Sequence, residues 1–326
     1  MTVSPIINPK RVLVTGANGF IGSHVIEALL TKGYPLKAVA RNALRSTPPN
    51  VEMIAADLSL PVDWREALGG VSNIIHLAAR VHQMNESPKM ALGEFKNINT
   101  RATLELAEQA AKAGVNRFIY LSTMAVNGTF TLPGESFTEV STPCPQSSYA
   151  ISKYEAELGL QKIARQYPME VVIIRPPMVY GANAPGNFSK LVSLIKTRIP
   201  LPFGCAKNPR SFIFIGNLVS FIETCINHPA AANELFLVSD ADDVSLCSMI
   251  EQISRNLELT SNIFPLPLAM LEGLLILLGR RGLANQLLKP MRIDISKAQS
   301  LLGWIPPYSV IGGLKLSVNT NLLQAK

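Results

Sequence analysis

"VLVTGANGFIG", from Val12 to Gly22, places three glycines three residues apart directly after a run of β-branched residues. The residues before Gly16 have the pattern of a buried strand, and from Phe20 onward the apolar residues take helical spacing. A strand, a tight glycine turn and a helix N-terminus together present backbone N–H groups to which a phosphate can bind. The stretch therefore predicts a dinucleotide pyrophosphate site at Gly16, Gly19 and Gly22.

The pattern of the following residues predicts the fold around this turn. Apolar strand-like runs alternate with segments in which apolar residues recur at steps of three and four. Such alternation is typical of a parallel sheet with right-handed crossovers and helices on both faces. We therefore expect an α/β fold with a doubly wound parallel sheet of the Rossmann type. The expected strands are 11–15, 36–40, 51–56, 73–79, 117–122 and 170–177, and the clearest helices are 20–33, 99–114 and 148–166.

Two Pro- and Gly-rich stretches, 175–187 and 198–204, end this alternation and indicate a second region built from loops and short helices. The expected bounds are 1–175 for a coenzyme-binding domain, with returning segments near 211–240, and 176–210 plus 241–326 for a smaller substrate-binding region.

Composition limits the classes of function. The 326 residues are 48% hydrophobic and 16% charged, which is typical of a packed soluble protein. The four cysteines are widely spaced and no export signal is recognisable, so we expect a cytoplasmic protein without a metal site. The net charge of +7 favours anionic ligands, but the charges are scattered and only 6% of residues are aromatic. We therefore expect a small anionic ligand and no nucleic acid.

The stretch "YAISK" pairs Tyr149 with Lys153 at helical spacing, so both side chains share one helix face. A nearby cation lowers the pKa of a phenol toward the range useful for acid–base catalysis. In the simplest alternative, both residues are only solvated on an exposed helix. Ser122 and Thr123 follow a buried strand at the sheet edge where such folds bind ligands, which favours the catalytic interpretation.

Arg41 follows the second expected strand, where enzymes that prefer NAD carry an acidic residue for the ribose 2′-hydroxyl. An arginine there suits a 2′-phosphate instead. We therefore favour NADP(H) as the coenzyme, with NAD(H) possible, and the alternative is that Arg41 only covers the adenine.

Several motifs together resemble those of the extended short-chain dehydrogenases/reductases, of the NAD-dependent epimerase/dehydratase type, which act on nucleotide sugars. These motifs are "TGANGFIG" (15–22), "HLAA" (76–79), "LST" (121–123), "YAISK" (149–153) and "IRPPMVYG" (174–181). The stretches "PLPFG" (200–204), "RSFIFIGNL" (210–218) and "DISKAQSLLGWIPP" (294–307) resemble more narrowly the bacterial UDP-4-keto-6-deoxy-N-acetylhexosamine 4-reductases of O-antigen synthesis.

The resemblance implies roles for individual residues. Tyr149 would be the acid–base residue, and Lys153 would bind the nicotinamide ribose and lower the tyrosine pKa. Thr123 would bind the reacting oxygen, with Ser122 beside it in contact with the substrate. The remaining coenzyme contacts implied by the resemblance are Gly16, Asn18, Gly19, Phe20, Ile21, Gly22, Asp57 at the adenine edge, Leu58, Leu77, Ala78, Ala79, Asn99 and Pro176.

Three further positions concern the cleft and the substrate. Arg210 would bind the nucleotide-sugar diphosphate through its planar guanidinium, unless it is an ordinary surface arginine. Met178 stands where epimerases of this family carry an asparagine that contacts the substrate phosphates, so we expect Asn187 to replace it. Asn99 is equally well explained as a helix cap.

The reaction is predicted from two departures from the family pattern. Met124 and Ala125 follow Thr123, where dehydratases carry acidic residues, so dehydration is not expected. Arg41 favours a reductase that draws on NADPH. We expect reduction of the C4 ketone of a UDP-linked 4-keto-6-deoxy-N-acetylhexosamine for surface polysaccharide synthesis. The alternatives are a UDP-hexose 4-epimerase with tightly bound NAD and, from another class, a non-catalytic coenzyme-sensing protein.

Two expectations concern surfaces. The family forms dimers through the helices expected at 99–114 and 148–166, so we expect a homodimer with Ala107, Ala111, Ala156 and Leu160 at its interface. The apolar segment 266–282 is too short to span a membrane and contains Glu272. We expect it to form a buried helix, and the alternative is an exposed apolar face that contacts a membrane or a partner.

Overall fold

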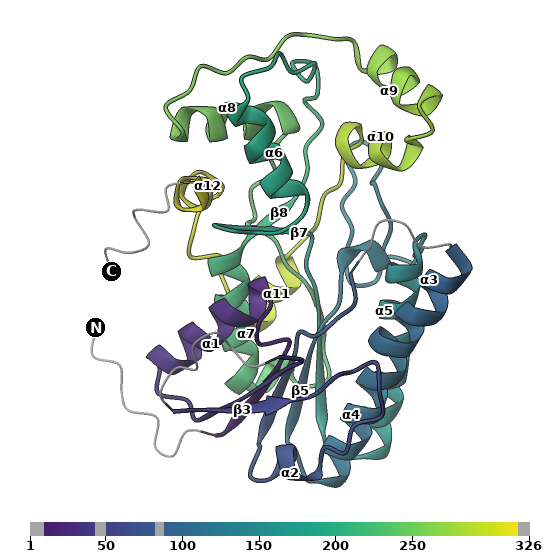
Figure 1. Cartoon of the computed structure of the whole chain (residues 1–326), viewed down its shortest axis with the longest axis vertical. Helices are drawn as coiled ribbons and strands as arrows, with labels where there is room; N and C mark the ends of the chain where they lie inside the picture. The colour runs from purple at the N-terminus through teal and green to yellow at the C-terminus, as the bar shows by residue number, and fades with distance from the viewer. Residues whose placement is uncertain (1–9, 43–49, 82–87, 319–326) are drawn as a thin grey trace. The chain divides into compact units, whose positions relative to one another are not determined.

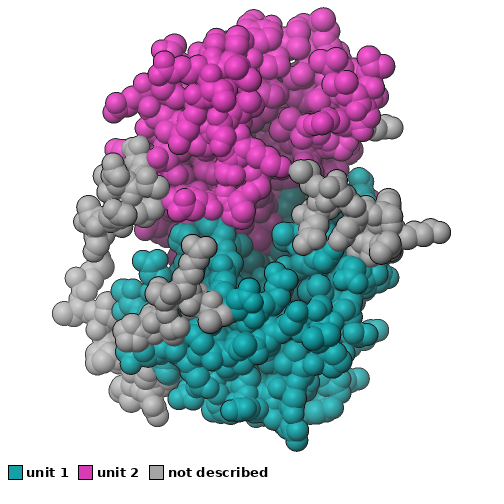
Figure 2. Space-filling view, in the orientation of Figure 1, with its two compact units in different colours: residues 1–126, 145–175, 222–236 teal, residues 127–144, 176–221, 237–326 magenta. Residues whose placement is uncertain are grey.

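The computed structural model describes residues 10–42, 50–81 and 88–318 (Figure 1). The chain divides into two compact units, which Figure 2 distinguishes by colour. Unit 1 comprises residues 1–126, 145–175 and 222–236, and unit 2 comprises 127–144, 176–221 and 237–326. Residues 127–144 thus group with unit 2, although we expected them in the coenzyme domain. The returning segment of unit 1 is also shorter than the expected 211–240.

Unit 1 is built on a parallel sheet, as the sequence predicts. Among the described residues, seven strands form this sheet in the order β3-β2-β1-β4-β5-β6-β9. The strand order reverses between β1 and β4, and in open α/β sheets ligands bind beside such a reversal. The strands are β1 (Val12–Thr15), β2 (Leu36–Ala40), β3 (Val51–Ala55), β4 (Asn73–His76), β5 (Arg117–Leu121), β6 (Glu170–Arg175) and β9 (Leu235–Leu237).

Helices cover both faces of the sheet, with α1 on one side and α4 and α5 on the other (Figure 1). The prediction of a doubly wound parallel sheet is therefore confirmed. The helices of this part of the chain are α1 (Phe20–Thr31), α2 (Arg65–Leu68), α3 (Pro88–Phe95), a π-helix (Lys96–Arg101), α4 (Ala102–Lys112) and α5 (Ser148–Gln166). The helix α7 (Ile215–Asn227) contains residues of both units.

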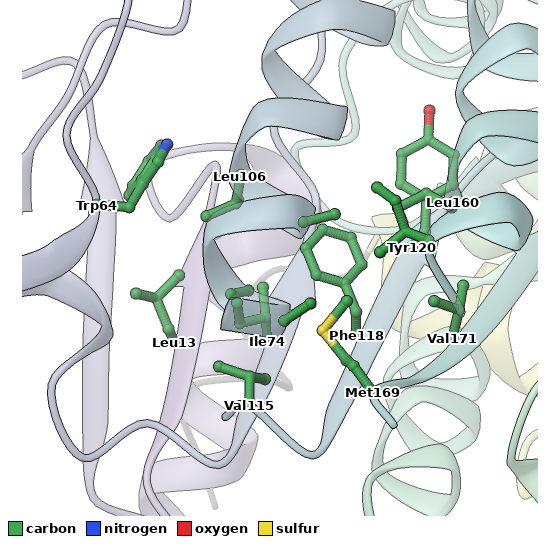
Figure 3. Close-up of a cluster of buried hydrophobic side chains, with 14 of the residues drawn as sticks. Leu13, Trp64, Ile74, Leu106, Val115, Phe118, Tyr120, Leu160, Met169 and Val171 are labelled. Atoms are coloured by element: carbon green, nitrogen blue, oxygen red, sulfur yellow. The ribbon is translucent and has the colours of Figure 1, made fainter. Parts of the chain in front are cut away.

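Alternate strand residues supply the core on the α4 and α5 side. Phe118 and Tyr120 of β5 belong to this cluster, whereas the intervening Ile119 does not, as the alternation of a strand requires. Leu106 of α4 and Leu160 of α5 belong to the same cluster (Figure 3). The sheet is apolar on both faces, which explains why its strands read as continuous hydrophobic runs.

The residues expected at the dimer interface are wrong, because they belong to this core, whereas a homodimer through α4 and α5 stays a prediction. Ala107, Ala156 and Leu160 are fully buried within the chain, and Ala111 is 8% exposed. α4 and α5 carry more apolar residues than are needed to cover the sheet. The additional residues pack between the two helices. The side chains of Ala107, Ala156 and Leu160 therefore cannot contact a second copy.

Unit 2 contains a small parallel pair, β7 (Met178–Tyr180) with β8 (Phe212–Phe214), and several helices. Asp240 joins the surrounding segments by accepting hydrogen bonds from the Tyr180 hydroxyl (2.7 Å), the Phe214 N–H (2.8 Å) and the Asn217 side chain (2.7 Å). The helices are α6 (Asn187–Lys196), α8 (Leu246–Asn256), α9 (Leu268–Leu277), α10 (Arg281–Leu288), α11 (Ser296–Leu302) and α12 (Val310–Val318).

Candidate active site

The glycine turn between β1 and α1 has the geometry that an anion site requires. Gly16 has φ +72°, and a Cβ atom there would lie 2.7 Å from the Ala78 backbone nitrogen. A Cβ at Gly22 would collide with the Gly16 carbonyl oxygen, so Gly22 lets the helix approach the turn. Gly19 is the N-cap of α1 and supplies no side-chain hydrogen bond, which leaves the first N–H groups of the helix open to a ligand.

A cavity of about 620 Å³ opens at this turn, along the carboxyl ends of β1 to β4. Nine of the expected coenzyme contacts line it, namely Gly16, Asn18, Gly19, Arg41, Asp57, Leu58, Leu77, Ala78 and Ala79. The lining residues that we did not anticipate are Thr15, Val39, Ala40, Ala56, Ser59, Arg80, Val81, Glu94 and Ile98. Most of them flank an anticipated residue, so extending each motif by one or two positions would have found them.

Arg41 and Asp57 lie at the ends of β2 and β3 and share this cavity. Asp57 accepts a hydrogen bond from the Ser59 N–H (2.9 Å), and this bond, with a smaller contribution from the Arg41 charge, lowers the pKa of the Asp57 carboxyl. Arg41 is exposed to solvent. The positive charge of Arg41 is therefore close to a carboxylate that partly compensates it.

Asn99 is neither a helix cap nor a lining residue of this cavity. It is fully buried in the π-helix, where its Oδ1 accepts from the Arg80 N–H (2.8 Å) and its Nδ2 donates to the Arg80 carbonyl (3.1 Å). Nδ2 also donates to Ser152 Oγ on α5 (3.1 Å). Asn99 thus fixes the segment after β4 that forms one wall of the cavity.

His76 is a positioning residue that we did not anticipate from the sequence. Its Nδ1 lies 2.7 Å from Thr15 Oγ1, and its Nε2 lies 2.9 Å from Thr103 Oγ1. Thr15 Oγ1 also accepts from the Ala78 N–H (3.3 Å), so the imidazole joins β1, the segment after β4 and α4 in one chain of hydrogen bonds. Burial lowers the pKa of His76 to about 3. A lone histidine within an apolar strand was the signal that the sequence offered.

The residues expected to act in acid–base catalysis lie on α5 and directly after β5. Tyr149 and Lys153 occupy the first turns of α5, whose N-cap Ser147 accepts from the Ala150 N–H (3.1 Å). Lys153 Nζ donates to the Leu121 carbonyl (2.8 Å), two residues before Thr123, and lies 4.6 Å from the centre of the Tyr120 ring. This contact ties the Tyr-x-x-x-Lys face of α5 to the strand that carries Thr123.

The pKa of Tyr149 differs from the expectation. Burial raises it to about 12, whereas we expected Lys153 to lower it. Burial also lowers the pKa of Lys153 to about 7, although the nearby Glu157 carboxylate opposes this shift. Desolvation is thus the main cause of both pKa shifts, and Tyr149 keeps its proton at neutral pH.

Thr123 is half-buried, and its Oγ1 accepts from the Ala125 N–H (3.2 Å). Its hydroxyl hydrogen has no acceptor among the residues that the structure describes, so it can be donated to a substrate oxygen. Met124, the next residue, is buried and apolar.

Ser122 does not present its hydroxyl to a substrate in this structure. It is buried and donates to Glu157 Oε1 on α5. Glu157 also accepts from Arg175 at the end of β6, with Nη2 to Oε2 at 2.5 Å and Nε to Oε1 at 2.9 Å. The Ser122–Glu157–Arg175 network joins the end of β5 to α5 and β6. We therefore replace the expected substrate contact with a positioning role.

The other expected coenzyme and substrate contacts lie outside this cavity. Phe20 and Ile21 are half-buried at the start of α1, and Pro176 is a buried residue that follows β6 and belongs to unit 2. Asn187 is the exposed first residue of α6.

Arg210 is buried within unit 2 and is not an ordinary surface arginine. It donates to the Lys289 carbonyl (2.5 Å), and its Nη2 lies 3.3 Å from Met291 Sδ. Burial lowers its pKa to about 10. No carboxylate among the described residues forms an ion pair with it. Its contact with a substrate diphosphate stays a prediction.

A dinucleotide-type glycine turn, a parallel sheet and a Thr, Tyr and Lys set at the end of β5 define an enzyme of the extended short-chain dehydrogenase/reductase type. The chain belongs to the NAD dependent epimerase/dehydratase family, whose model matches residues 12–238.

Two relatives illustrate the range of the family. The chain is 37% identical to a UDP-glucose 4-epimerase of Vibrio cholerae, over 94% of both chains. It is 25% identical to the N-acetyl-alpha-D-glucosaminyl-diphospho-ditrans,octacis-undecaprenol 4-epimerase of Escherichia coli O157:H7, over 97% of this chain and 96% of the relative. Among solved structures, the UDP-glucuronic acid 4-epimerase of Bacillus cereus in complex with NAD shares the fold. It has a TM-score of 0.77 at 21% identity and covers 97% of this chain and 100% of that chain.

Proposed function

We propose that this protein is a 4-epimerase that inverts C4 of a UDP-linked hexose with NAD as its coenzyme. The observation that carries the choice is the 37% identity to the Vibrio cholerae UDP-glucose 4-epimerase across 94% of both chains. The motifs alone favoured a 4-ketone reductase. The comparisons support the epimerase better, and the same three catalytic residues serve both reactions.

The chain's own residues fit a dinucleotide. The turn has no room for a Cβ at Gly16, and the uncapped N-terminus of α1 offers N–H groups to a pyrophosphate. Asp57 and Arg41 would hold the adenosine end of the coenzyme, and Lys153 would hold the nicotinamide ribose. When bound, the nicotinamide supplies the acceptor and donor of the hydride at C4.

The surroundings of Arg41 favour NAD over the NADP(H) expected from the sequence. The 2′-phosphate of NADP would add negative charge next to the groups that surround the adenosine ribose. Asp57 lines the same cavity, and its pKa is lowered, so it is charged at neutral pH. Two charges of opposite sign at this end of the cavity suit an uncharged ribose hydroxyl at least as well as a phosphate.

Tyr149 would take the proton of the C4 hydroxyl and later return it, while Thr123 donates a hydrogen bond to the same oxygen. Burial opposes loss of the Tyr149 proton, so a cation must favour the phenolate. The ammonium of Lys153, one helical turn along α5, would be that cation. The apolar Met124 beside Thr123 supplies no acid for dehydration.

Arg210 and the N-terminus of α6 would bind the substrate diphosphate. Arg210 is buried without an acidic partner among the described residues, and a diphosphate would compensate its charge. The N-cap of α6, Gly186, makes no side-chain capping bond, so the first N–H groups beside Asn187 also favour an anion.

The direct test is incubation of the purified protein with UDP-glucose and, separately, with UDP-N-acetylglucosamine, without any added reductant. We expect conversion to the corresponding galacto epimers, measured by chromatography. The matched control is Tyr149→Phe, in which conversion should be lost.

A second incubation, with UDP-4-keto-6-deoxy-N-acetylglucosamine and NADPH, examines the reductase. Loss of the NADPH absorbance in that mixture, with no interconversion of the UDP-hexoses, would overturn the epimerase and restore the reductase.

A further inference from the structure

The helix α9 is apolar on its outer surface as well as on its inner one. Leu271 is buried, and Leu268 and Leu275 are half-buried, so these three form the covered stripe of the helix. Met270, Leu274 and Leu277 form a second stripe at steps of four and three, with 62%, 50% and 84% of their surfaces exposed. A helix on the surface of a soluble protein ordinarily has only the first of these stripes.

Other apolar side chains extend this exposed surface at both ends of α9. Leu278, directly after the helix, is 62% exposed, and Phe264, four residues before it, is 42% exposed. Residues 262–264 form backbone hydrogen bonds with Leu201. Ile199, two residues before Leu201, is 49% exposed. We call the exposed side chains of Met270, Leu274, Leu277 and Leu278 the α9 patch. The expectation of a buried helix at 266–282 is therefore wrong.

The charges around the α9 patch are predominantly positive. Residues 259–292 contain four basic residues and one acidic residue, Glu272. Arg292 is paired with Asp243 at 2.7 Å, so the net positive charge of this segment comes from Arg280 and Arg281. The Glu272 carboxylate lies 3.8 Å from Lys289 Nζ, so it is already partly compensated. Arg280 is exposed immediately after the apolar residues. The surface thus combines apolar side chains with basic ones, which is the pattern of a segment that lies on an anionic bilayer.

We propose that the α9 patch docks this enzyme onto the surface of an anionic membrane, with Met270, Leu274 and Leu277 entering the headgroup region. The helix has 10 residues, and none of the described helices is long and apolar enough to cross a membrane. α9 and α10 lie beside each other and form a short helical hairpin (Figure 1). Such a hairpin lies at the interface of a bilayer and does not enter its interior.

Charge distinguishes a membrane from a second copy of the chain. An isologous interface would place this basic surface against its own copy, and like charges oppose such contact. Anionic headgroups compensate the same charges, and each basic residue near such a surface strengthens binding. The membrane is therefore the better occupant.

Flotation of the full-length protein with vesicles tests the proposal. We expect binding to vesicles of phosphatidylcholine mixed with phosphatidylglycerol, weak binding to phosphatidylcholine alone, and weaker binding as salt is raised. Leu277→Glu and Met270→Glu should each reduce binding about tenfold or more, because a leucine-sized side chain no longer enters the apolar layer. Arg280→Glu should reduce it several-fold.

The matched control is Ile311→Glu on α12, which removes an isoleucine that is 58% exposed elsewhere in unit 2. It should leave vesicle binding unchanged. All variants should keep their far-UV circular dichroism and their turnover of soluble substrate, so loss of docking is distinct from failure of the proposed function.

Four outcomes would overturn the proposal. The wild type could fail to float with anionic vesicles, or it could bind phosphatidylcholine alone equally well. Leu277→Glu and Ile311→Glu could reduce binding to the same extent. Finally, Leu277→Glu could convert a dimer to a monomer in sedimentation without vesicles, which would assign the α9 patch to a second copy.

Discussion

The phenol of Tyr149 keeps its proton at neutral pH in the isolated chain, because burial raises its pKa to about 12. The proposed role of Tyr149 as the proton carrier predicts that Tyr149→Phe lowers kcat by about 100-fold or more, the usual cost of losing a general acid–base group. Coenzyme binding should stay unchanged, since the glycine turn holds the phosphates. Steady-state rates and coenzyme titration measure the two effects. Retention of more than about a tenth of the rate would exclude Tyr149 as this residue.

His76 makes stability sensitive to acid. Its pKa is about 3 in the folded chain, against 6.5 for a solvated histidine, so between these values the unfolded chain binds more protons than the folded one. The His76 contribution to stability is therefore complete above pH 6.5 and is lost as pH falls toward 3.

We expect the difference in unfolding free energy between the wild type and His76→Leu to shrink as pH is lowered through this window. Urea unfolding at several pH values measures this difference. A difference that does not change with pH would show that His76 is not buried neutral.

At the scale of elements, α4 and α5 pack through residues that we expected from the sequence to lie at a dimer interface. Leu160 is fully buried in the core between α5 and the sheet, whereas Leu158 is 41% exposed on the same helix. We expect Leu160→Glu to lower the free energy of unfolding by about 3 kcal/mol or more, because a carboxylate would be buried without a partner. Leu158→Glu is the matched control and should change stability by less than about 1 kcal/mol. Equal effects on chemical denaturation would contradict this assignment.

Element boundaries differ from the sequence prediction where side chains bind the backbone. The expected strand 73–79 ends at His76, because the Thr15 hydroxyl accepts from the Ala78 N–H and Asn99 binds both backbone groups of Arg80. The same contacts accompany a π-helix at Lys96–Arg101, where helical periodicity alone predicts an ordinary helix from residue 99. π-helical turns occur frequently at functional sites, and Ile98 of this π-helix lines the cavity at the glycine turn.

At the scale of the whole molecule, coenzyme binding should stabilise the chain. A ligand that binds only the folded state adds about 2.7 kcal/mol at a concentration one hundred times its Kd. We expect NAD to raise the thermal unfolding midpoint of the wild type. Arg41→Asp should keep this rise with NAD and abolish any rise with NADP, since an aspartate accepts from the ribose hydroxyl and repels a 2′-phosphate. Thermal melts with each coenzyme test this. Parallel changes for both would show that Arg41 does not contact the ribose.

The sequence by itself determined the features that depend on neighbouring residues. The glycine turn, the strand and helix order of unit 1 and the Tyr-x-x-x-Lys pair are local patterns with fixed spacing. The glycine spacing at 16, 19 and 22 reflects backbone approach within one turn, and α5 occupies residues 148–166 as its periodicity predicts.

Only the tertiary structure decided which helix faces are buried and how burial shifts the pKa values of the site residues. Two pairs of apolar helix residues illustrate this difference. Ala107 and Leu160 are buried, whereas Leu274 and Leu277 are exposed. Burial depends on residues distant in sequence, and so do the Ser122–Glu157–Arg175 network and the raised pKa of Tyr149. Periodicity reports that a helix has an apolar face, but the segments that pack against that face come from elsewhere in the chain.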